Sequence, residues 1–240
     1  MFGLFSKEKT LQKTIERATN KLAQHVDRMA AIQQLYKEGT DAAVVGLCKR
    51  FNVTSSKGVE DEDEKDQVMK MLIGLGKLPP VVRYMKGSDH LAFPLRVVEK
   101  IATHDEVLAT VDGLFATETP GYVRMPERRI DLIRWFGEWK GGSDDEVISR
   151  IAPYVTDFDE NVRFAAIDCI AHREPAKLAP PLIAALVRPE EESWRIKRTI
   201  AEVLEKTKAP LGARADEVAR AISGPLADDF RVGDDRIVKR

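Results

Sequence analysis

The chain has 240 residues, of which 43% are hydrophobic and 32% charged, and its formal net charge at pH 7 is −1. This content suffices for a continuous core, and the near-zero net charge argues against a surface built entirely for nucleic acid. No run approaches the roughly 20 apolar residues that a membrane span requires, and residues 1–5 are too short for a secretory signal, so we expect a cytoplasmic protein.

Residues 7–24 are predicted to form an amphipathic helix for which Ser6 supplies the N-cap. Its apolar stripe consists of Leu11, Ile15, Ala18 and Leu22. Its basic stripe, beside the apolar one, consists of Lys13, Arg17 and Lys21. We interpret residues 1–25 as a helix that caps the open end of a helical array and turns its charges to water.

A second interpretation of this segment involves Phe2, Leu4 and Phe5, which precede the basic helix. Such a segment can insert at an anionic membrane surface, or into an apolar groove on a partner. Binding by one short segment is marginal, so this interpretation requires a second contact.

Further helices are predicted along the rest of the chain from apolar periodicity, caps and glycine or proline stops. Their expected ranges are 27–37, 40–51, 67–76, 79–85, 89–102, 105–116, 126–140, 143 onward, 175–187, 190–206 and 213–223. Residues 60–66 carry six acids and one lysine, and we expect a solvated loop that enters a helix. An acidic docking patch is the alternative, because the run lacks the alternating ligands and central glycine of a calcium-binding loop.

An internal repeat organises these helices. Aligned apolar anchors recur at spacings of 38, 28, 35, 34 and 34 residues, at Leu35, Ile73, Ile101, Phe136, Ile170 and Leu204. A unit of this length holds two helices and two turns, and it buries its apolar face only when units stack. The pattern predicts about six stacked helical hairpins.

The clearest repeat reads DFDENVRFAAIDCIA from Asp157, with an acidic turn followed by Val162 and Arg163. Thirty-four residues later the pair is Ile196 and Lys197, after another acidic turn. This resembles the HEAT-repeat family, most closely over residues 143–208 and least over 1–88. The resemblance implies an all-α, right-handed α-solenoid over residues 26–224. We expect residues 225–240 to form a tail in which Phe230 and Ile237 can fold back over the last repeat.

We find no motif that carries catalysis, a metal or a cofactor. No two of the four histidines are spaced i, i+4, and the chain lacks the His-Glu pairs of deoxyhypusine hydroxylase, a HEAT-repeat enzyme. Cys48 and Cys169 lie in apolar helical segments, and we expect buried free thiols in a reducing compartment.

A group of basic and aromatic side chains suggests a binding surface. Arg129, Arg163 and Lys197 occupy one repeat position at intervals of 34 residues and should form a ladder. The ladder can follow a phosphate backbone while tryptophans stack on bases, and alkylpurine DNA glycosylases are similar HEAT-like stacks. The favoured alternative is structural, with the ladder paired to acids of neighbouring turns, for which the available residues are Asp157, Asp159 and Glu192.

The sequence therefore predicts a non-enzymatic scaffold or adaptor that presents a curved helical surface to a protein partner. Because tryptophan and arginine dominate binding energy at interfaces, the expected contact residues are Trp139, Trp194, Arg195 and Arg198. We expect Trp135 to be packed and Trp139 to be less constrained. The alternatives are a nucleic-acid-binding protein, a peripheral membrane adaptor led by residues 1–24, and an accessory protein similar to the HEAT-like phycobilisome lyases, which would need a deep apolar pocket.

Overall fold

A computed structural model describes residues 2–55 and 57–240, although not the side chains of residues 2–6. The regular secondary structure of the described residues is helical except for one C-terminal β-hairpin, which confirms the all-α prediction. It divides into two compact units, unit 1 (Met1–Leu114) and unit 2 (Phe115–Arg240).

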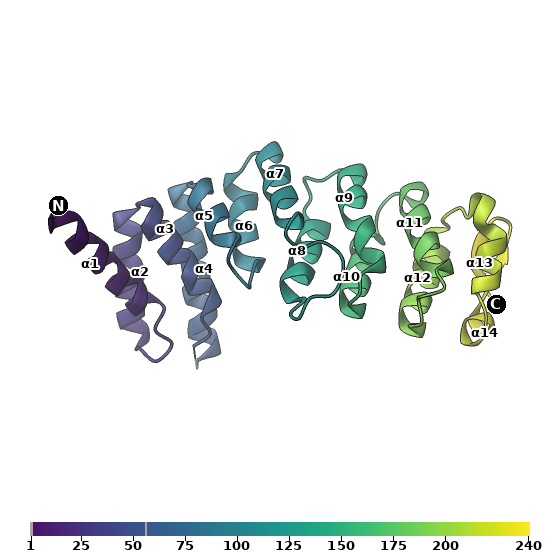
Figure 1. The fold of residues 1–240 in the computed structure, drawn as a ribbon, viewed down its shortest axis with the longest axis horizontal. Helices are drawn as coiled ribbons and strands as arrows, with labels where there is room; N and C mark the ends of the chain where they lie inside the picture. The colour runs from purple at the N-terminus through teal and green to yellow at the C-terminus, as the bar shows by residue number, and fades with distance from the viewer. Residues whose placement is uncertain (1, 56) are drawn as a thin grey trace. The chain divides into compact units, whose positions relative to one another are not determined.

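Unit 1 is built from helices that alternate between two layers (Figure 1). The helix α1 packs against α2 and α3, the helices α2, α4 and α6 are neighbours in one layer, and α3 and α5 are neighbours in the other. The bounds are α1 Phe2–Ala18, α2 His25–Glu38, α3 Asp41–Cys48, η1 Lys49–Asn52, α4 Gly58–Leu75, α5 Leu78–Met85, α6 Ala92–Ile101 and α7 His104–Phe115.

Unit 2 repeats this alternation, with α8, α10 and α12 in one layer and α9, α11 and α13 in the other. The bounds are α8 Glu127–Glu138, α9 Asp144–Ile151, η2 Ala152–Thr156, α10 Glu160–Ile170, α11 Pro175–Val187, α12 Trp194–Thr207, η3 Gly212–Arg214, α13 Ala215–Ala221, α14 Pro225–Asp229, β1 Phe230–Gly233 and β2 Arg236–Lys239. Ser143 and Glu146 form the predicted capping box at α9.

The repeat anchors identify one layer of helices in each unit. All six anchors lie on even-numbered helices, α2, α4 and α6 in unit 1 and α8, α10 and α12 in unit 2. Leu35, Phe136, Ile170 and Leu204 are completely buried. The 34-residue spacing in unit 2 therefore separates equivalent helices of successive hairpins.

The first helix differs from the prediction at both ends. It begins at Phe2, so Ser6 lies inside the helix rather than at its N-cap, and it ends at Ala18. Leu22 consequently leaves the apolar stripe and is exposed in the turn before α2. The apolar side of α1 packs against α3. Gly46, on α3, leaves the space for this contact, because an added Cβ would lie 2.6 Å from Cγ1 of Ile15.

The prediction that residues 60–66 form a solvated loop is wrong, because this run lies inside α4 and two of its acids are buried. The side chain of Glu64 has no exposed surface and accepts hydrogen bonds from Arg28 (Nη2, 2.7 Å), Arg50 (Nε, 2.8 Å) and the Nδ1 atom of His25 (2.6 Å). Asp61 pairs with Arg50 at 2.6 Å. This cluster joins α2, η1 and α4, and burying these charges is tolerable only because each carboxylate has cationic partners.

The C-terminal tail is ordered as an antiparallel hairpin that pairs Phe230 with Lys239 and Val232 with Ile237. Asp234 and Asp235 both have positive φ, as a tight two-residue hairpin turn requires. Phe230 and Ile237 are buried, which confirms that the tail folds back. The hairpin contacts α12 and α13 and covers the end of unit 2.

Breaking the buried cluster should destabilise unit 1 strongly. Glu64→Ala leaves two buried arginines without a carboxylate, and we expect a loss of about 3–5 kcal/mol in the free energy of unfolding. Hydrogen exchange of α2 and α4 amides measures this loss. Glu62→Ala, on the exposed face of α4, is the control and should change stability by less than about 0.5 kcal/mol. Equal effects of the two changes would contradict the role assigned to the cluster.

The cluster should also make unit 1 sensitive to acid. Burial raises the pKa of Asp61, but hydrogen bonds from Lys65, Arg50 and the Ser55 backbone outweigh it and lower the pKa from 3.8 to about 2. A carboxylate with a depressed folded pKa contributes stability above its unfolded pKa and loses it as the pH falls. We therefore expect the urea concentration at which half of unit 1 is unfolded to decrease as the pH falls from about 4 to about 2. Hydrogen exchange of the α4 amides monitors this unfolding. The decrease should be smaller in Asp61→Asn, which has no carboxylate to protonate at this position.

Candidate interaction surface

The arginine ladder is embedded between successive hairpins of unit 2. Nη1 of Arg129, on α8, lies 2.8 Å from Oδ2 of Asp157, in the turn before α10, and both side chains are buried. The same nitrogen donates to the carbonyl of Gly121 at 2.9 Å, and the Gly121 N–H donates to Asp157 at 3.2 Å. One ion pair thus fixes the long loop before α8 and the turn before α10 together.

The next rung repeats this arrangement one hairpin later. Nε of Arg163 lies 2.9 Å from Oε2 of Glu191, whose other oxygen accepts from the backbone N–H of Ser193 at 3.0 Å. Asp157 makes the equivalent turn contact, accepting from the N–H of Asp159 at 2.9 Å. The expected acid Asp157 is confirmed, whereas at the second rung the partner is Glu191 rather than Glu192.

The third ladder position behaves differently. The Nζ atom of Lys197 lies 5.3 Å from the centre of the Trp194 ring, a cation–π contact. Trp194 itself packs beside Gly224, where an added Cβ would lie 3.1 Å from its ring. Lys197 therefore packs on a tryptophan that contacts the residue before α14, and it does not pair with an acid of a further hairpin.

A groove of about 560 Å³ lies between the C-terminal halves of α8 and α10. The cations Arg134 and Lys140 and the acids Glu138 and Asp168 are exposed along it. Arg173 closes one side and donates to the carbonyl of Gly137 at 2.8 Å. This groove therefore has mixed charge.

Trp139 forms part of this groove but is mostly hidden, with 7% of its surface exposed. Its ring stacks on those of Trp135 and Phe136, with centroids 6.2 and 5.8 Å away, and lies over Gly141 and Gly142. The expectation that Trp139 is less constrained is therefore wrong, while Trp135 is packed as predicted. Little of the Trp139 side chain is therefore accessible to a partner.

A second groove of about 440 Å³ adjoins the first, between α10 and α12. Asp168, His172 and Arg173 line both grooves, so they form the ridge between them. Thr199, Val203 and Lys206 line the far side, on α12. The α8, α10 and α12 layer thus offers one surface with two adjoining hollows.

The other predicted contact residues are exposed but already engaged within unit 2. Arg195 lies over the Phe164 ring at 4.4 Å and 3.3 Å from Glu160. Arg198 pairs with Glu202 at 3.1 Å and with Asp229 at 2.8 Å. These contacts join neighbouring helices and neutralise much of the positive charge. The predicted anchors Phe2, Leu4 and Phe5 lie outside the described side chains.

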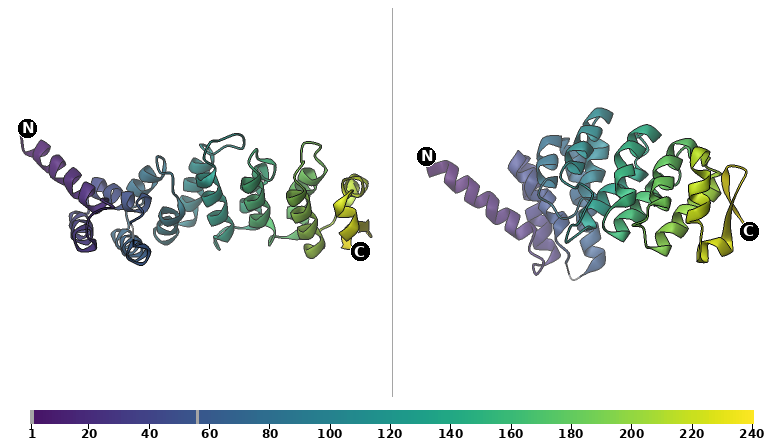
Figure 2. Two further views of the ribbon diagram at one scale, coloured as in Figure 1. Left: turned by 90° about the horizontal axis from the view of Figure 1, so that it is seen from below. Right: turned by 45° about the vertical axis from the view of Figure 1, so that its right-hand side comes forward.

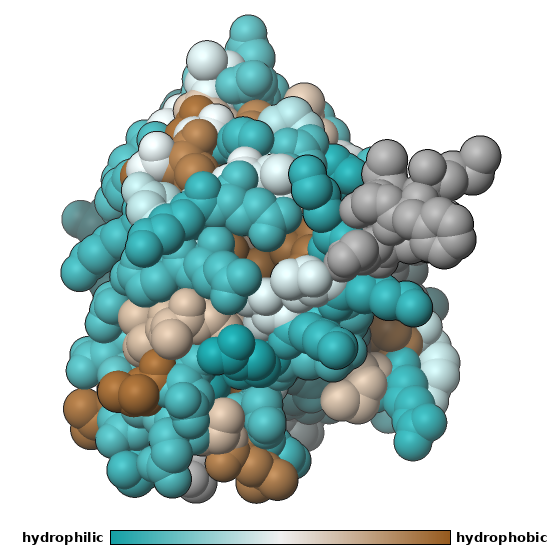
Figure 3. Space-filling view, turned by 90° about the vertical axis from the view of Figure 1, so that its left-hand side faces the viewer, coloured by the Kyte–Doolittle hydropathy of each residue, from teal (hydrophilic) through white to brown (hydrophobic). Residues whose placement is uncertain are grey.

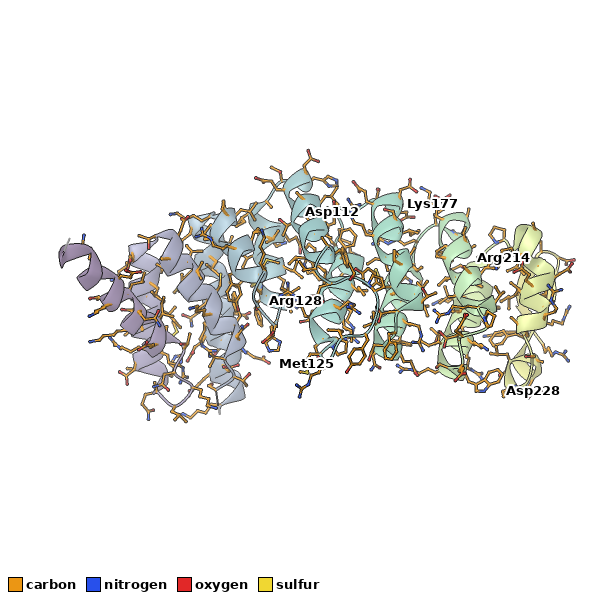
Figure 4. The ribbon with its side chains drawn as sticks, in the orientation of Figure 1. Asp112, Met125, Arg128, Lys177, Arg214 and Asp228 are labelled. Carbon is orange, nitrogen blue, oxygen red and sulfur yellow. The ribbon has the colours of Figure 1, made fainter. Side chains whose placement is uncertain are left out.

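Sequence reasoning missed an exposed aromatic pair at the opposite ends of the same helices. Tyr122, in the loop before α8, meets Phe158, in the turn before α10, edge to face at 5.4 Å. Met125 is exposed in the same loop and lies at the lower edge of unit 2 in Figure 4. The unusual length of this loop was the available signal, because long ordered loops commonly carry function.

The two cysteines are poor nucleophiles. Burial raises the pKa of both Cys48 and Cys169 to about 12, which leaves them as unreactive thiols at neutral pH. Cys48 is buried as expected, but Cys169 is only half-buried. Among the residues that the structure describes, no group of three His, Cys, Asp or Glu side chains is arranged to hold a metal ion.

Comparison of the chain with protein-family models, with curated proteins and with solved structures found no match. Within the described part of the chain, every helix is too short or too polar to cross a membrane.

The Arg129–Asp157 pair should contribute strongly to the stability of unit 2. Asp157→Ala leaves a buried arginine unpaired, so we expect unfolding free energy to fall by about 3–5 kcal/mol. Urea denaturation followed by tryptophan fluorescence reports on unit 2 alone, because all three tryptophans lie there. The control is Asp145→Ala, which removes an exposed pair with Lys177 and should cost at most about 1 kcal/mol. A cost for Asp157→Ala no larger than the control would refute this role.

Proposed function

We propose that this protein is a non-enzymatic interaction scaffold and that the α8, α10 and α12 layer of unit 2 binds a protein partner. The observation that carries the proposal is the pair of adjoining grooves on this layer. Grooves between packed helices are frequent binding sites, and their floor here is set by buried, interlocked side chains that need no rearrangement.

The charges in these grooves favour protein over nucleic acid. Arg134 and Lys140 alternate with Glu138 and Asp168, and the acids would repel a phosphate backbone. The ladder arginines, which were the best candidates for phosphate contacts, are paired with carboxylates. A partner that offers both acidic and basic side chains satisfies such a surface better than a polyanion does.

The exposed pair Tyr122 and Phe158 supports the same proposal. Aromatic side chains contribute much of the binding energy at protein interfaces, and the Arg129–Asp157–Gly121 contacts hold this pair in place before binding. The proposal also includes membership of the HEAT-like class, which the alternation of helices in two layers and the paired ladder support.

The test is a pull-down from the protein's own cells, with soluble and membrane fractions kept separate and washes at low and high salt. We expect a protein partner in stoichiometric amount that survives high salt. The variant Arg134→Glu/Asp168→Lys should reduce its recovery about tenfold or more, because it exchanges the charges across the first groove.

The matched control is Lys177→Glu/Asp145→Lys, which exchanges an ion pair between α11 and α9, in the other layer. Lys177 lies at the opposite edge of unit 2 from Met125 in Figure 4. This control should recover the partner as the wild type does. Recovery of nucleic acid alone, stripped by salt, would overturn the proposal, and so would equal recovery by both variants.

A further inference from the structure

We propose that unit 1 carries a self-complementary surface through which two copies of this chain associate about a two-fold axis. The inference is independent of the proposed function, which concerns unit 2. It begins from three large apolar side chains that unit 1 leaves in water: Leu22 is 85% exposed, Val26 73% and Val59 80%. We call these three residues the apolar patch.

The residues of the apolar patch lie on segments that meet at one small cleft. Leu22 lies in the α1–α2 turn, Val26 in the first turn of α2, and Val59 in the first turn of α4. Leu22 lines a hollow of about 170 Å³ together with His25, which precedes Val26, and with Lys57 and Glu60, which flank Val59. Figure 3 faces this N-terminal end and shows hydrophobic residues near its lower edge among hydrophilic ones.

One flank of the patch is basic. Because Ile15 and Ala18 face α2 and α3, the opposite side of α1 presents the cations Lys9, Lys13 and Arg17 to solvent, where they outnumber the acids Glu8 and Glu16. The exposed cation Lys21 follows in the turn after α1. Within the part of the chain that the structure describes, none of these four makes an ion pair. All four side chains are exposed, and Figure 2 shows the N-terminal part of α1 leading away from the other helices of unit 1.

The other flank is acidic and lies on α4. Its inward acids, Asp61 and Glu64, are buried and form ion pairs with Arg28 and Arg50. Its outward acids Glu62, Asp63 and Asp66 are exposed, and they too lack an ion pair among the described residues. The helix α2 contacts both α1 and α4 and therefore separates the two flanks.

This arrangement matches what a two-fold interface requires. In such an interface the same surface is used by both copies, so residue i meets residue j and residue j meets residue i. An axis through the apolar patch places Leu22, Val26 and Val59 against their counterparts. It also sets the basic flank of each copy against the acidic flank of the other, twice per dimer.

Other occupants use this surface less completely. An anionic membrane or a nucleic acid is attracted to the basic flank but repelled by the acidic one. An acidic peptide meets the same conflict. A second copy of the chain satisfies both flanks and removes the apolar patch from water, which is favourable.

The experiment is sedimentation velocity of the full chain over a range of concentrations, at about 0.05 M and about 0.5 M NaCl. We expect a concentration-dependent dimer that weakens at high salt. The acidic variant Lys13→Glu/Arg17→Glu and the basic variant Glu62→Lys/Asp66→Lys should each raise the dimer dissociation constant about tenfold or more, because both flanks then carry like charge.

Mixing these two variants in equal amounts supplies the decisive outcome. Each flank of one copy then meets an opposite charge on the other, so a heterodimer should form at concentrations where each variant alone is mostly monomeric. The control Lys208→Glu/Arg220→Glu reverses two exposed charges in unit 2 that line neither groove, and it should dimerise as the wild type does. Circular dichroism confirms that each variant is folded.

Three outcomes would overturn the proposal. A wild-type chain that stays monomeric at every concentration and at both salts excludes the dimer. Unchanged dimerisation of either charge-reversal variant shows that the flanks do not meet, and the absence of a heterodimer on mixing excludes the two-fold pairing.

Discussion

A buried guanidinium must have a carboxylate partner, and this requirement connects the helices within each unit. In unit 1, Arg28 and Arg50 converge on Glu64, so two helices and a 3₁₀ turn meet at one carboxylate. In unit 2, Arg129 and Arg163 each reach an acid in the turn that opens the next helix of the same layer. The apolar core supplies most of the driving force for packing, whereas these pairs fix the alignment of one helix on the next.

The repeat in the sequence predicted the helical layers because it records which residues must be buried. Anchors at the regular spacing, such as Ile170 and Leu204, are completely buried, whereas Ile73 and Ile101, where the spacing slips, are only half-buried. Caps were predictable for the same local reason, as with Ser143 and Glu146. The ladder partner Asp157 also followed from the period, since equivalent positions in a stack lie beside one another.

The remaining errors concern residues whose environment is set by distant segments. The acids of α4 look solvent-exposed in the sequence, and only the arginines on α2 and η1 reveal that Asp61 and Glu64 point inward. Trp139 was expected to be accessible, but its ring packs on the backbone of Gly141 and Gly142, where a side chain would clash with it, and on the Trp135 ring. The grooves were not predictable either, since their depth depends on how α8, α10 and α12 pack.

The repeated carboxylate at the turn has an evolutionary consequence. Asp157 and Glu191 lie 34 residues apart, as do Arg129 and Arg163, and each acid serves both its own turn and the preceding hairpin. Removing one complete repeat would set Arg129 opposite Glu191, and duplicating one would insert a further pair. Whole repeats can therefore be added or removed while every buried arginine keeps a carboxylate partner. A partial deletion would instead remove an acid that both its own turn and the preceding hairpin need.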